Sequence, residues 1–259
     1  MSERPSAGSI DAFYRDLWSR ERWSGSEPNS NEWDRWQAIE RLLDKAMEIG
    51  SLEPDRATIL DLGCGRGWLA HLLAAHGRVI GIDPLAASIE AACENFPGLT
   101  FRRATSADLV AEGHEPFDLI VSSEVIEHIP DEEKVLFFED TRRLLRPGGF
   151  LLLTTPRGEL WVNWSRRGVG QQPIEEWLTE AALDDHLRSA GFIVLMRDRA
   201  HPPKHPLAWE GHLLKWILNR KGIRRVPLAG LRSLLAYRAS QYQVRLARRP
   251  LEQPPCSPG

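Results

Sequence analysis

The sequence predicts a doubly wound α/β fold, in which helices cover both faces of a mostly parallel sheet. From residue 57 onward, short apolar runs alternate with amphipathic segments at the spacing of repeated β-α units. The run FDLIVSS (117–123) is almost wholly apolar, as a central parallel strand buried on both faces should be. The chain has 42% hydrophobic and 27% charged residues, which is typical of a soluble globular protein, and no apolar run could span a bilayer.

The first 55 residues are helical in pattern and rich in tryptophan. A polar break, SGSEPNSN (24–31), separates a helix expected near 9–20 from a longer one expected near 32–49, with Asn31 as the predicted N-cap. We expect residues 1–55 to form a helical cap over the site at the sheet edge.

The remaining strands and helices follow in alternation, and together they give a domain over 56–249. Strands are predicted at 57–62, 78–83, 99–103, 117–123, 150–156, 192–198 and 241–249. Helices are predicted after the glycine loop 63–67 and over 84–96, 131–145 and 175–191. The segment 200–240 is too long for a turn, so we expect a helical insertion there, with helices near 208–220 and 228–239. The Pro-rich tail 250–259 is expected to be disordered.

Charge is distributed unevenly along the chain. Residues 1–200 carry 22 Lys and Arg against 34 Asp and Glu, a net charge of −12, whereas residues 201–250 carry 11 against one, a net charge of +10. The basic segment either meets an anionic partner or uses arginine for solubility, and both interpretations stay open. The N-terminus lacks the apolar region of a secretory signal, and the three cysteines have no metal-binding or disulfide pattern. We therefore expect a cytoplasmic, reduced protein.

A glycine loop and two acids mark a ligand site. Asp61 ends the strand 57–62, the loop Gly63-Cys64-Gly65-Arg66-Gly67 follows, and Asp83 ends the next strand. An open α/β sheet binds ligands at the carboxyl ends of its strands, where a carboxylate can accept both hydroxyls of a ribose. Glycines allow the sharp turn and the close approach of a ligand.

Two cofactors would suit such a loop, a dinucleotide or S-adenosylmethionine (SAM). A pyrophosphate would lie close to Asp61, a repulsion of roughly several kcal/mol at an effective dielectric constant near 20. The ammonium and sulfonium groups of SAM instead favour a nearby acid. The loop also reads G-x-G-x-G and not the dinucleotide pattern G-x-G-x-x-G. These residues therefore favour SAM.

Four motifs, ILDLGCGRG, VIGID, FDLIVSSEVIEHI and LLRPGGFLLLTTP, resemble in order and spacing those of class I SAM-dependent methyltransferases. The resemblance covers 57–199, the strand at 241–249 completes the pattern, and the chain is most similar to the ubiquinone-biosynthesis O-methyltransferase group. It implies a Rossmann-like methyltransferase fold with seven strands in the order 3-2-1-4-5-7-6 and an antiparallel strand seven.

The resemblance also implies how the cofactor is held. Asp61 and the loop backbone would hold the methionine part, Asp83 the ribose, and Arg35, four residues before an isoleucine, the SAM carboxylate. A surface arginine is the alternative for Arg35. Many members have an acid after strand three for the adenine amine, but here Asp108 comes late, so we expect Ser106 or backbone amides to bind adenine. The implied cofactor-binding residues are Arg35, Asp61, Gly63, Cys64, Gly65, Asp83, Pro84, Thr105, Ser106, Ala107, Ser123 and Glu124.

The expected chemistry centres on the string Glu124-Val125-Ile126-Glu127-His128. The methyl group of SAM already sits on a good leaving group, so the enzyme must align the reactants and remove a proton from a hydroxyl acceptor. His128, with Glu127, is the predicted catalytic pair because imidazole suits proton removal at neutral pH. A histidine that only caps the loop before the helix 131–145 is the alternative.

The same string permits a metal site. In small-RNA 2′-O-methyltransferases a similar E-x-x-E-H supplies a divalent metal, so Glu124, Glu127 and His128 are candidate ligands. The fourth ligand would be a later histidine, and Gln172 stands at that position here. We do not expect a metal, and the acidic body of the chain argues against a nucleic-acid partner.

Aromatic residues are the candidates for the acceptor pocket, although core packing could explain them as well. They are Tyr14, Trp18, Trp23, Trp161 and Trp164. In the insertion 200–240, apolar residues lie next to a basic rim, which suits peripheral contact with an anionic membrane, a lid, or packing on the sheet.

We predict methyl transfer from SAM to a hydroxyl of a small molecule such as a natural product, a sugar or a quinone-like compound. Three alternatives remain open: a prenylated or lipid-linked acceptor at a membrane surface, metal-assisted RNA 2′-O-methylation, and a non-catalytic SAM-binding partner subunit. The oligomeric state is not indicated by the sequence.

Overall fold

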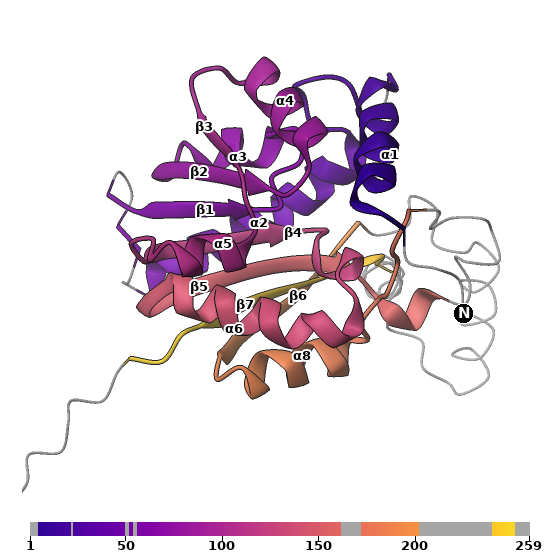
Figure 1. The fold of residues 1–259 in the computed structure, drawn as a ribbon. Helices are drawn as coiled ribbons and strands as arrows, with labels where there is room; N and C mark the ends of the chain where they lie inside the picture. Colours follow the sequence, from indigo (N-terminus) through magenta and orange to yellow (C-terminus); the bar gives the residue numbers. More distant parts are fainter. Residues whose placement is uncertain are drawn as a thin grey trace, which may run out of the picture.

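A computed structural model describes residues 5–21, 23–49, 52–53, 56–161, 172–201 and 240–251. They form a seven-stranded sheet in the order β3-β2-β1-β4-β5-β7-β6 (Figure 1). β1 to β5 pair in parallel, whereas β7 is antiparallel to both of its neighbours, β5 and β6. The predicted fold class and strand order are thereby confirmed.

The strands lie close to the predicted positions. They are β1 Thr58–Leu62, β2 Arg78–Asp83, β3 Thr100–Arg103, β4 Phe117–Ser123, β5 Leu145–Pro156, β6 Ile193–Ala200 and β7 Tyr242–Arg248. The main difference is β5, which starts five residues before the predicted residue 150. The RPGG segment continues the strand through an irregularity in register, and two glycines allow this. Gly148 has φ +81°, and a Cβ on Gly149 would lie close to the carbonyl oxygen of Phe117. The predicted strand, which begins at residue 150, therefore leaves out the RPGG segment that the structure includes in β5.

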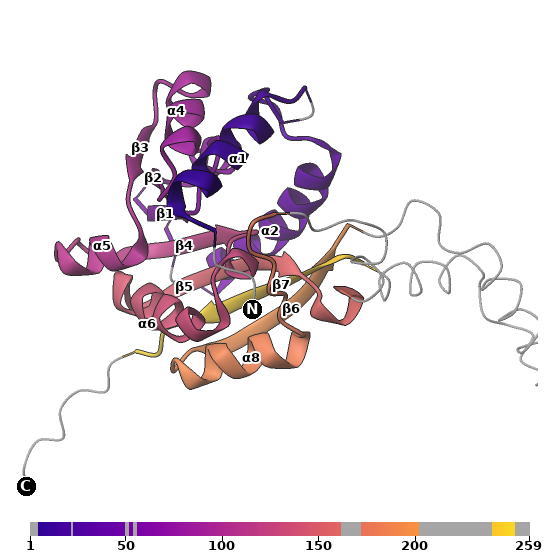
Figure 2. The same cartoon turned by 45° about the vertical axis from the view of Figure 1, so that its right-hand side comes forward.

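Helices cover both faces of the sheet, as Figures 1 and 2 show. On one face, α2 (Ser30–Glu48) and α3 (Trp68–Leu73) share an apolar core with β1, β4, β5 and β7, and α4 (Ala86–Asn95) packs on β2 and β3. The opposite core contains α5 (Ser106–Ala111), α6 (Lys134–Leu144) and α8 (Glu180–Ser189). Three short 3-10 helices, η1 (Ile126–His128), η2 (Asp131–Glu133) and η3 (Gly158–Leu160), complete the described helical elements.

Two helix starts differ from the prediction because of local capping. Asn29, and not Asn31, caps α2: its side chain accepts from the backbone N–H of Glu32, whose own carboxylate accepts from Asn29 N–H at 2.7 Å. α8 begins at Glu180 instead of 175 because the Thr179 hydroxyl caps it. The six-residue helix α5 was not predicted.

The first helix, α1 (Ala7–Ser19), lies at the end of the sheet toward which the parallel strands point, beside α4 (Figures 1 and 2). Asp11 accepts from Ala87 N–H at 3.0 Å and so caps α4, and Arg15 forms an ion pair with Glu90 at 2.6 Å. These contacts hold α1 over the carboxyl ends of the strands.

None of the helices in the described part of the chain combines the length and apolar character needed to cross a bilayer. The helices predicted near 208–220 and 228–239, the residue Trp164 and nearly all of the tail 250–259 lie outside the described residues. Their predicted roles stay predictions.

Candidate active site

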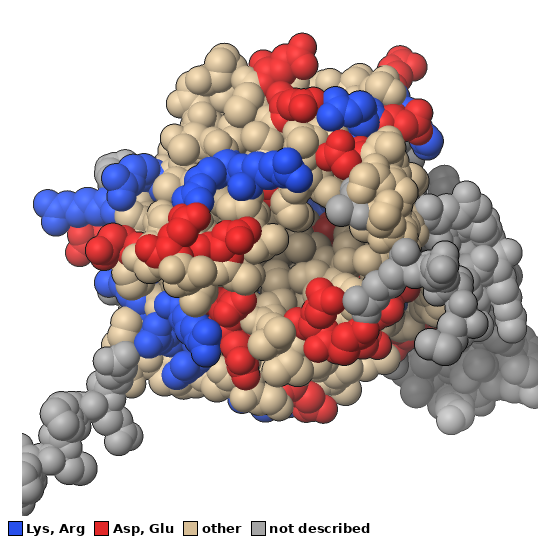
Figure 3. Space-filling model, in the orientation of Figure 1, with Lys and Arg blue, Asp and Glu red and all other residues tan. Residues whose placement is uncertain are grey.

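The carboxyl ends of β1, β2 and β4 open onto a cavity of about 1450 Å³. Single small ligands typically occupy pockets of roughly 300–1,000 Å³, so two ligands could lie here side by side. Figure 3 shows a hollow on this face with acidic side chains along one rim. The described lining comes from α1, α2, the glycine loop, the start of α5, η1, the segment that precedes α8 and the first residue of β7.

The glycine loop is shaped by contacts that exclude a side chain. Gly63 has φ +82°, and a Cβ there would lie 2.3 Å from a methyl group of Val125. The backbone N–H groups of Gly63 and Cys64 both donate to the Ile82 carbonyl, at 2.8 and 2.9 Å. The loop therefore folds back over the end of β2 and exposes its backbone to the cavity.

Two buried carboxylates flank the loop. Burial raises the pKa of Asp61 to about 7, and its Oδ2 has no hydrogen-bond partner among the described residues. Burial likewise raises the pKa of Asp83 to about 6, against the lowering effect of N–H donors from Leu85 (2.9 Å) and Gly65 (3.1 Å). A ligand that brings a cation or hydrogen-bond donors would favour the ionised forms of both groups. The ammonium and ribose hydroxyls of SAM have this chemistry.

Glu124 follows β4 in a left-handed backbone conformation, φ +61°, which is rare outside glycine and marks local strain. Its N–H donates to the Thr154 carbonyl at 3.0 Å, and its Oε1 accepts from the Thr154 hydroxyl at 3.1 Å. The hydroxyl of Ser123 also contacts that of Thr154, at 2.9 Å. Burial, together with the nearby Glu127, raises the pKa of Glu124 to about 8. These bonds hold the unusual turn and direct its carboxylate to the cavity.

His128 has a defined tautomer. Its Nδ1 lies 2.8 Å from the carbonyl oxygen of Ile174, which can only accept, so Nδ1 carries the proton in the neutral ring. Nε2 is then the unprotonated nitrogen, and it lies 3.9 Å from Oε1 of Glu127. Glu127 is only 2% exposed, accepts from the Thr155 hydroxyl at 2.9 Å, and has its pKa raised by burial to about 8. The arrangement can accept a proton at Nε2.

Arg35 is buried at the wall of the cavity, so the surface interpretation of this residue is wrong. Its guanidinium lies 5.0 Å from the ring of Tyr242 and 4.0 Å from a carboxylate oxygen of Glu124. Its Nε has no hydrogen-bond partner within the described parts of the chain. The group is placed to donate to an anionic ligand.

Near the end of β3, Thr105, Ser106 and Ala107 line the cavity together with Pro84. The late acid of this region, Asp108, is used internally: it accepts from the N–H and the hydroxyl of Thr105, both at 2.8 Å, and so forms a capping box with Thr105, the N-cap of α5. Ser106 and the backbone are therefore the polar groups available to a base at this end.

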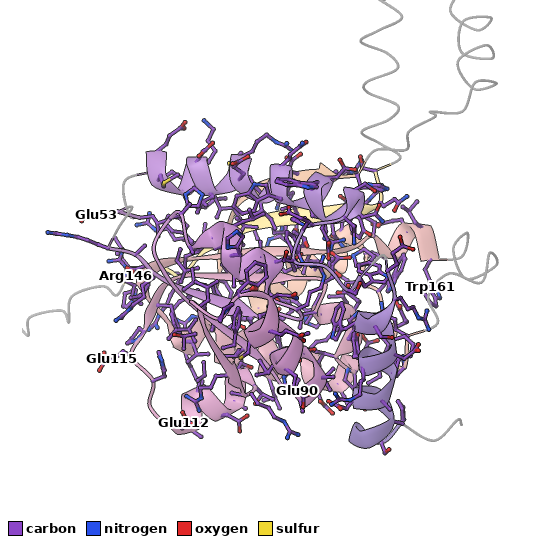
Figure 4. All side chains as sticks on the ribbon, turned by 90° about the horizontal axis from the view of Figure 1, so that it is seen from above. Glu53, Glu90, Glu112, Glu115, Arg146 and Trp161 are labelled. Carbon is purple, nitrogen blue, oxygen red and sulfur yellow. The ribbon has the colours of Figure 1, made fainter. Side chains whose placement is uncertain are left out.

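Three of the five aromatic candidates, Tyr14, Trp18 and Trp23, line the cavity. The Tyr14 hydroxyl donates to Gln172 Oε1 at 2.7 Å, and burial raises the pKa of Tyr14 well above its ordinary value. Trp161 is not among the lining residues. It packs against Trp177, which does line the cavity, with the two ring centroids 5.1 Å apart. Figure 4 shows Trp161 at the opposite side of the molecule from Glu53 and Arg146.

Glu124, Glu127 and His128 do not form a metal centre in this arrangement. Across the described ranges, no group of three or more His, Cys, Asp or Glu side chains is close enough to hold a metal ion. The side-chain oxygen of Gln172 is engaged by Tyr14.

Two residues that shape the site were not predicted from the sequence. Arg66, inside the glycine loop, is fully buried, pairs with Glu32 at 2.6 Å and donates to the Glu27 carbonyl at 3.1 Å, which ties the N-terminal segment to the loop. Tyr242, the first residue of β7, comes to the cavity only through the late antiparallel strand. No local pattern signals either contact, because both partners are distant in sequence.

Comparisons with known proteins agree with this geometry. A family described as a methyltransferase domain matches residues 33–224. A ubiquinone biosynthesis O-methyltransferase of Bartonella tribocorum is 34% identical over 140 residues, which cover 52% of this chain and 55% of that protein. One of Rhizobium johnstonii is 30% identical over 196 residues, 67% of this chain and 77% of that protein. The chain thus spans about half the length of the Bartonella relative it matches.

A solved structure of the N-methyltransferase NodS from Bradyrhizobium japonicum, in complex with S-adenosyl-L-homocysteine (SAH), shares the fold. Its TM-score is 0.62 at 17% identity, with 93% of this chain and 98% of that chain covered. The match of the family over 33–224 and the coverage of the Rhizobium relative show that the chain belongs to the SAM-dependent methyltransferase family.

Proposed function

We propose that this protein transfers the methyl group of SAM to a hydroxyl of a small quinol-like molecule, with His128 as the general base. The observation that carries the proposal is the tautomer of His128, which leaves Nε2 unprotonated in a residue that lines the same cavity as the glycine loop and Asp83. The relatives named ubiquinone biosynthesis O-methyltransferase support a hydroxyl on a quinol-like ring as the acceptor.

In this proposal SAM supplies a methyl group activated on a sulfonium. Asp61 and the backbone of Gly63, Cys64 and Gly65 hold its methionine part, and Arg35 donates to its carboxylate. Asp83, with Pro84 beside it, receives the ribose hydroxyls, and Ser106 with the backbone of Thr105 and Ala107 faces the adenine. The unpartnered Oδ2 of Asp61 and the unpartnered Nε of Arg35 support these assignments, since each is buried and lacks a partner that the cofactor would supply.

Ser123 and Glu124 lie at the end of β4, where the methyl group would be presented. The strained turn at Glu124 places its carboxylate between Thr154 and Arg35. Such a turn is held at a cost of about 1–3 kcal/mol, which is common where a site must be preorganised.

The proton of the acceptor hydroxyl passes to Nε2 of His128 as the oxygen attacks the methyl carbon. The ring then carries a positive charge, and its Nε2–H lies near the Glu127 carboxylate, 3.9 Å away. Two opposite charges at this distance attract by about 4 kcal/mol at an effective dielectric constant near 20. Burial raises the pKa of Glu127 to about 8, but the sulfonium of bound SAM and the charge on His128 would both favour its ionised form. In that form Glu127 stabilises the charge that forms on His128, and His128 releases the proton to solvent after the product leaves.

Tyr14, Trp18 and Trp23 form the aromatic wall on which the acceptor ring stacks. Trp177, in the segment that precedes α8, also lines the cavity and contributes to this wall. Trp161 packs against the ring of Trp177 and does not contact the acceptor in this arrangement.

The test is transfer of tritiated methyl from SAM into cell extract, separated into polar small molecules, lipids and RNA, with and without a chelator. We expect chelator-insensitive label in small molecules, or in lipids if the acceptor is prenylated, and loss of that label with His128→Gln. His114→Gln is the matched control, because His114 also contacts a backbone carbonyl, at 2.7 Å, but lies outside the cavity lining. Label in RNA that is lost with chelator, or tight SAM binding without transfer to any fraction, would overturn the proposal.

A further inference from the structure

The carbonyl that fixes the tautomer of His128 belongs to a segment without regular secondary structure. Ile174 lies in residues 174–179, which precede α8 and have no helix or strand of their own. A carbonyl in such a segment can orient a ring only if other contacts hold the segment in place. The contacts that do so gather at one buried lysine.

Lys134, the first residue of α6, is fully buried. Its ammonium donates to the backbone carbonyl of Glu176 at 2.9 Å and to the carboxylate of Asp131, and it lies 3.7 Å from the carboxylate of Glu176. That carboxylate in turn accepts from the N–H of Asp131. The three residues Lys134, Asp131 and Glu176 form a clamp between the start of α6 and the irregular segment.

The clamp acts two residues from the carbonyl that His128 uses. Glu176 also donates its backbone N–H to the carbonyl of Glu127, at 2.8 Å, so the segment runs alongside η1. With Glu176 fixed by Lys134, the Ile174 carbonyl has little freedom to move away from Nδ1. Ion pairs that lie on the surface contribute little, but a fully buried ammonium with two hydrogen-bond acceptors and a second carboxylate nearby holds its partners firmly.

We propose that Lys134 is a positioning residue for His128: the clamp keeps the Ile174 carbonyl on Nδ1 and thereby leaves Nε2 unprotonated toward the cavity. When the clamp is removed, the ring can turn or exchange its proton, and a fraction of the molecules carries the proton on Nε2. That form cannot accept a proton from the acceptor. The effect on catalysis rests on the proposed function, whereas the effect on the tautomer does not.

Lys134→Met is a suitable first variant because it leaves no buried charge behind. The side chains of Asp131 and Glu176 are 72% and 41% exposed, so water can solvate both after the lysine is gone. Glu176→Ala is the second variant, which weakens the clamp from the exposed side and keeps the buried lysine. Lys45→Met is the control: it removes a lysine from an exposed ion pair with Glu48 on α2.

The primary readout is the tautomer of His128, measured from the nitrogen chemical shifts of the ring in the full-length protein labelled with ¹⁵N-histidine. Wild type and Lys45→Met should show protonated Nδ1 and unprotonated Nε2 in the neutral ring. Lys134→Met and Glu176→Ala should show a mixture. With a catechol acceptor, kcat should fall by about 10- to 100-fold in Lys134→Met, as expected for a misplaced catalytic group, while the Kd for SAM stays unchanged.

The outcomes separate the two claims. An unchanged tautomer in a folded Lys134→Met or Glu176→Ala protein overturns the inference, whatever the activity. A mixed tautomer with unchanged methyl transfer supports the positioning role of Lys134 and overturns the role of His128 as base. A mixed tautomer with reduced kcat supports both.

Discussion

Replacing Asp61 by asparagine should change stability and SAM binding in opposite directions. Burial raises the pKa of Asp61 from 3.8 to about 7, so the folded protein keeps this proton between these pH values while the unfolded chain loses it. Stability therefore falls as pH rises through that window, by about 1.4 kcal/mol per pH unit, and by about 4 kcal/mol in total at pH 8.

Asp61→Asn removes this pH-dependent cost. The amide NH2 group that takes the place of Oδ2 would lack an acceptor, and an unpartnered buried donor costs about 1–3 kcal/mol. At pH 8 the net gain is about 1–3 kcal/mol, or about 5 °C in Tm for a domain of this size. At pH 5.5 the wild-type cost is only about 2 kcal/mol, because the window from 3.8 to 7 is half crossed, and the unpartnered amide offsets most of it, so the net gain should be close to zero. SAM binding at pH 8 should weaken by about 10- to 100-fold, the loss of one charge-assisted hydrogen bond.

Thermal unfolding at pH 5.5 and pH 8, with and without SAM, tests the predicted change in stability. Calorimetric titration with SAM tests the predicted change in binding. Asp118→Asn is the control: Asp118 lies at the other end of the sheet and accepts from Thr58 N–H at 2.6 Å. This variant should lose stability at both pH values and keep the full SAM-induced shift. An Asp61→Asn protein that is destabilised equally at both pH values, or that binds SAM as tightly as wild type, would refute the reasoning.

Three further predictions concern the same cavity. Glu127→Gln should lower kcat by at least about 10-fold, because it removes the charge that faces the His128 imidazolium; an unchanged kcat in steady-state assays would contradict this. Burial raises the pKa of Glu124 and of Glu127 to about 8, so a bound sulfonium beside them would favour their ionised forms. SAM binding should therefore tighten by up to about tenfold per pH unit from pH 6 to 8 and release protons, whereas the binding of SAH, which has no sulfonium, should depend less on pH. Equal pH dependence of the two ligands in calorimetry would contradict this prediction. Gly63→Ala should destabilise the protein by more than about 2 kcal/mol in denaturant unfolding, since a Cβ at φ +82° meets a methyl group at 2.3 Å, whereas Gly98→Ala, which meets open space, should be nearly neutral.

The sheet and its ligand-binding edge could be predicted because they depend on local patterns. Apolar runs set the strands, and the glycine loop with Asp61 and Asp83 lies where consecutive strands end. Patterns a few residues long also placed His128 beside the cavity, since it follows β4 directly.

Contacts between distant segments could not be predicted. The burial of Arg35 depends on Tyr242, which arrives from β7, and the orientation of His128 depends on a carbonyl 46 residues later in the chain. The predicted cap at Asn31 was wrong because two asparagines stand two positions apart, and only the reciprocal bond from Glu32 selects Asn29. These features arise from tertiary packing, which sequence spacing alone does not encode.

The most direct test of the account is the transfer of tritiated methyl from SAM to a simple catechol, 4-methylcatechol, by wild type and His128→Gln. We expect a product methylated on oxygen, and a kcat about 10²- to 10⁴-fold lower for His128→Gln at an unchanged Kd for SAM. Equal rates for the two proteins, or a methyl group on carbon, would contradict the assignment of His128 as the base for a hydroxyl acceptor.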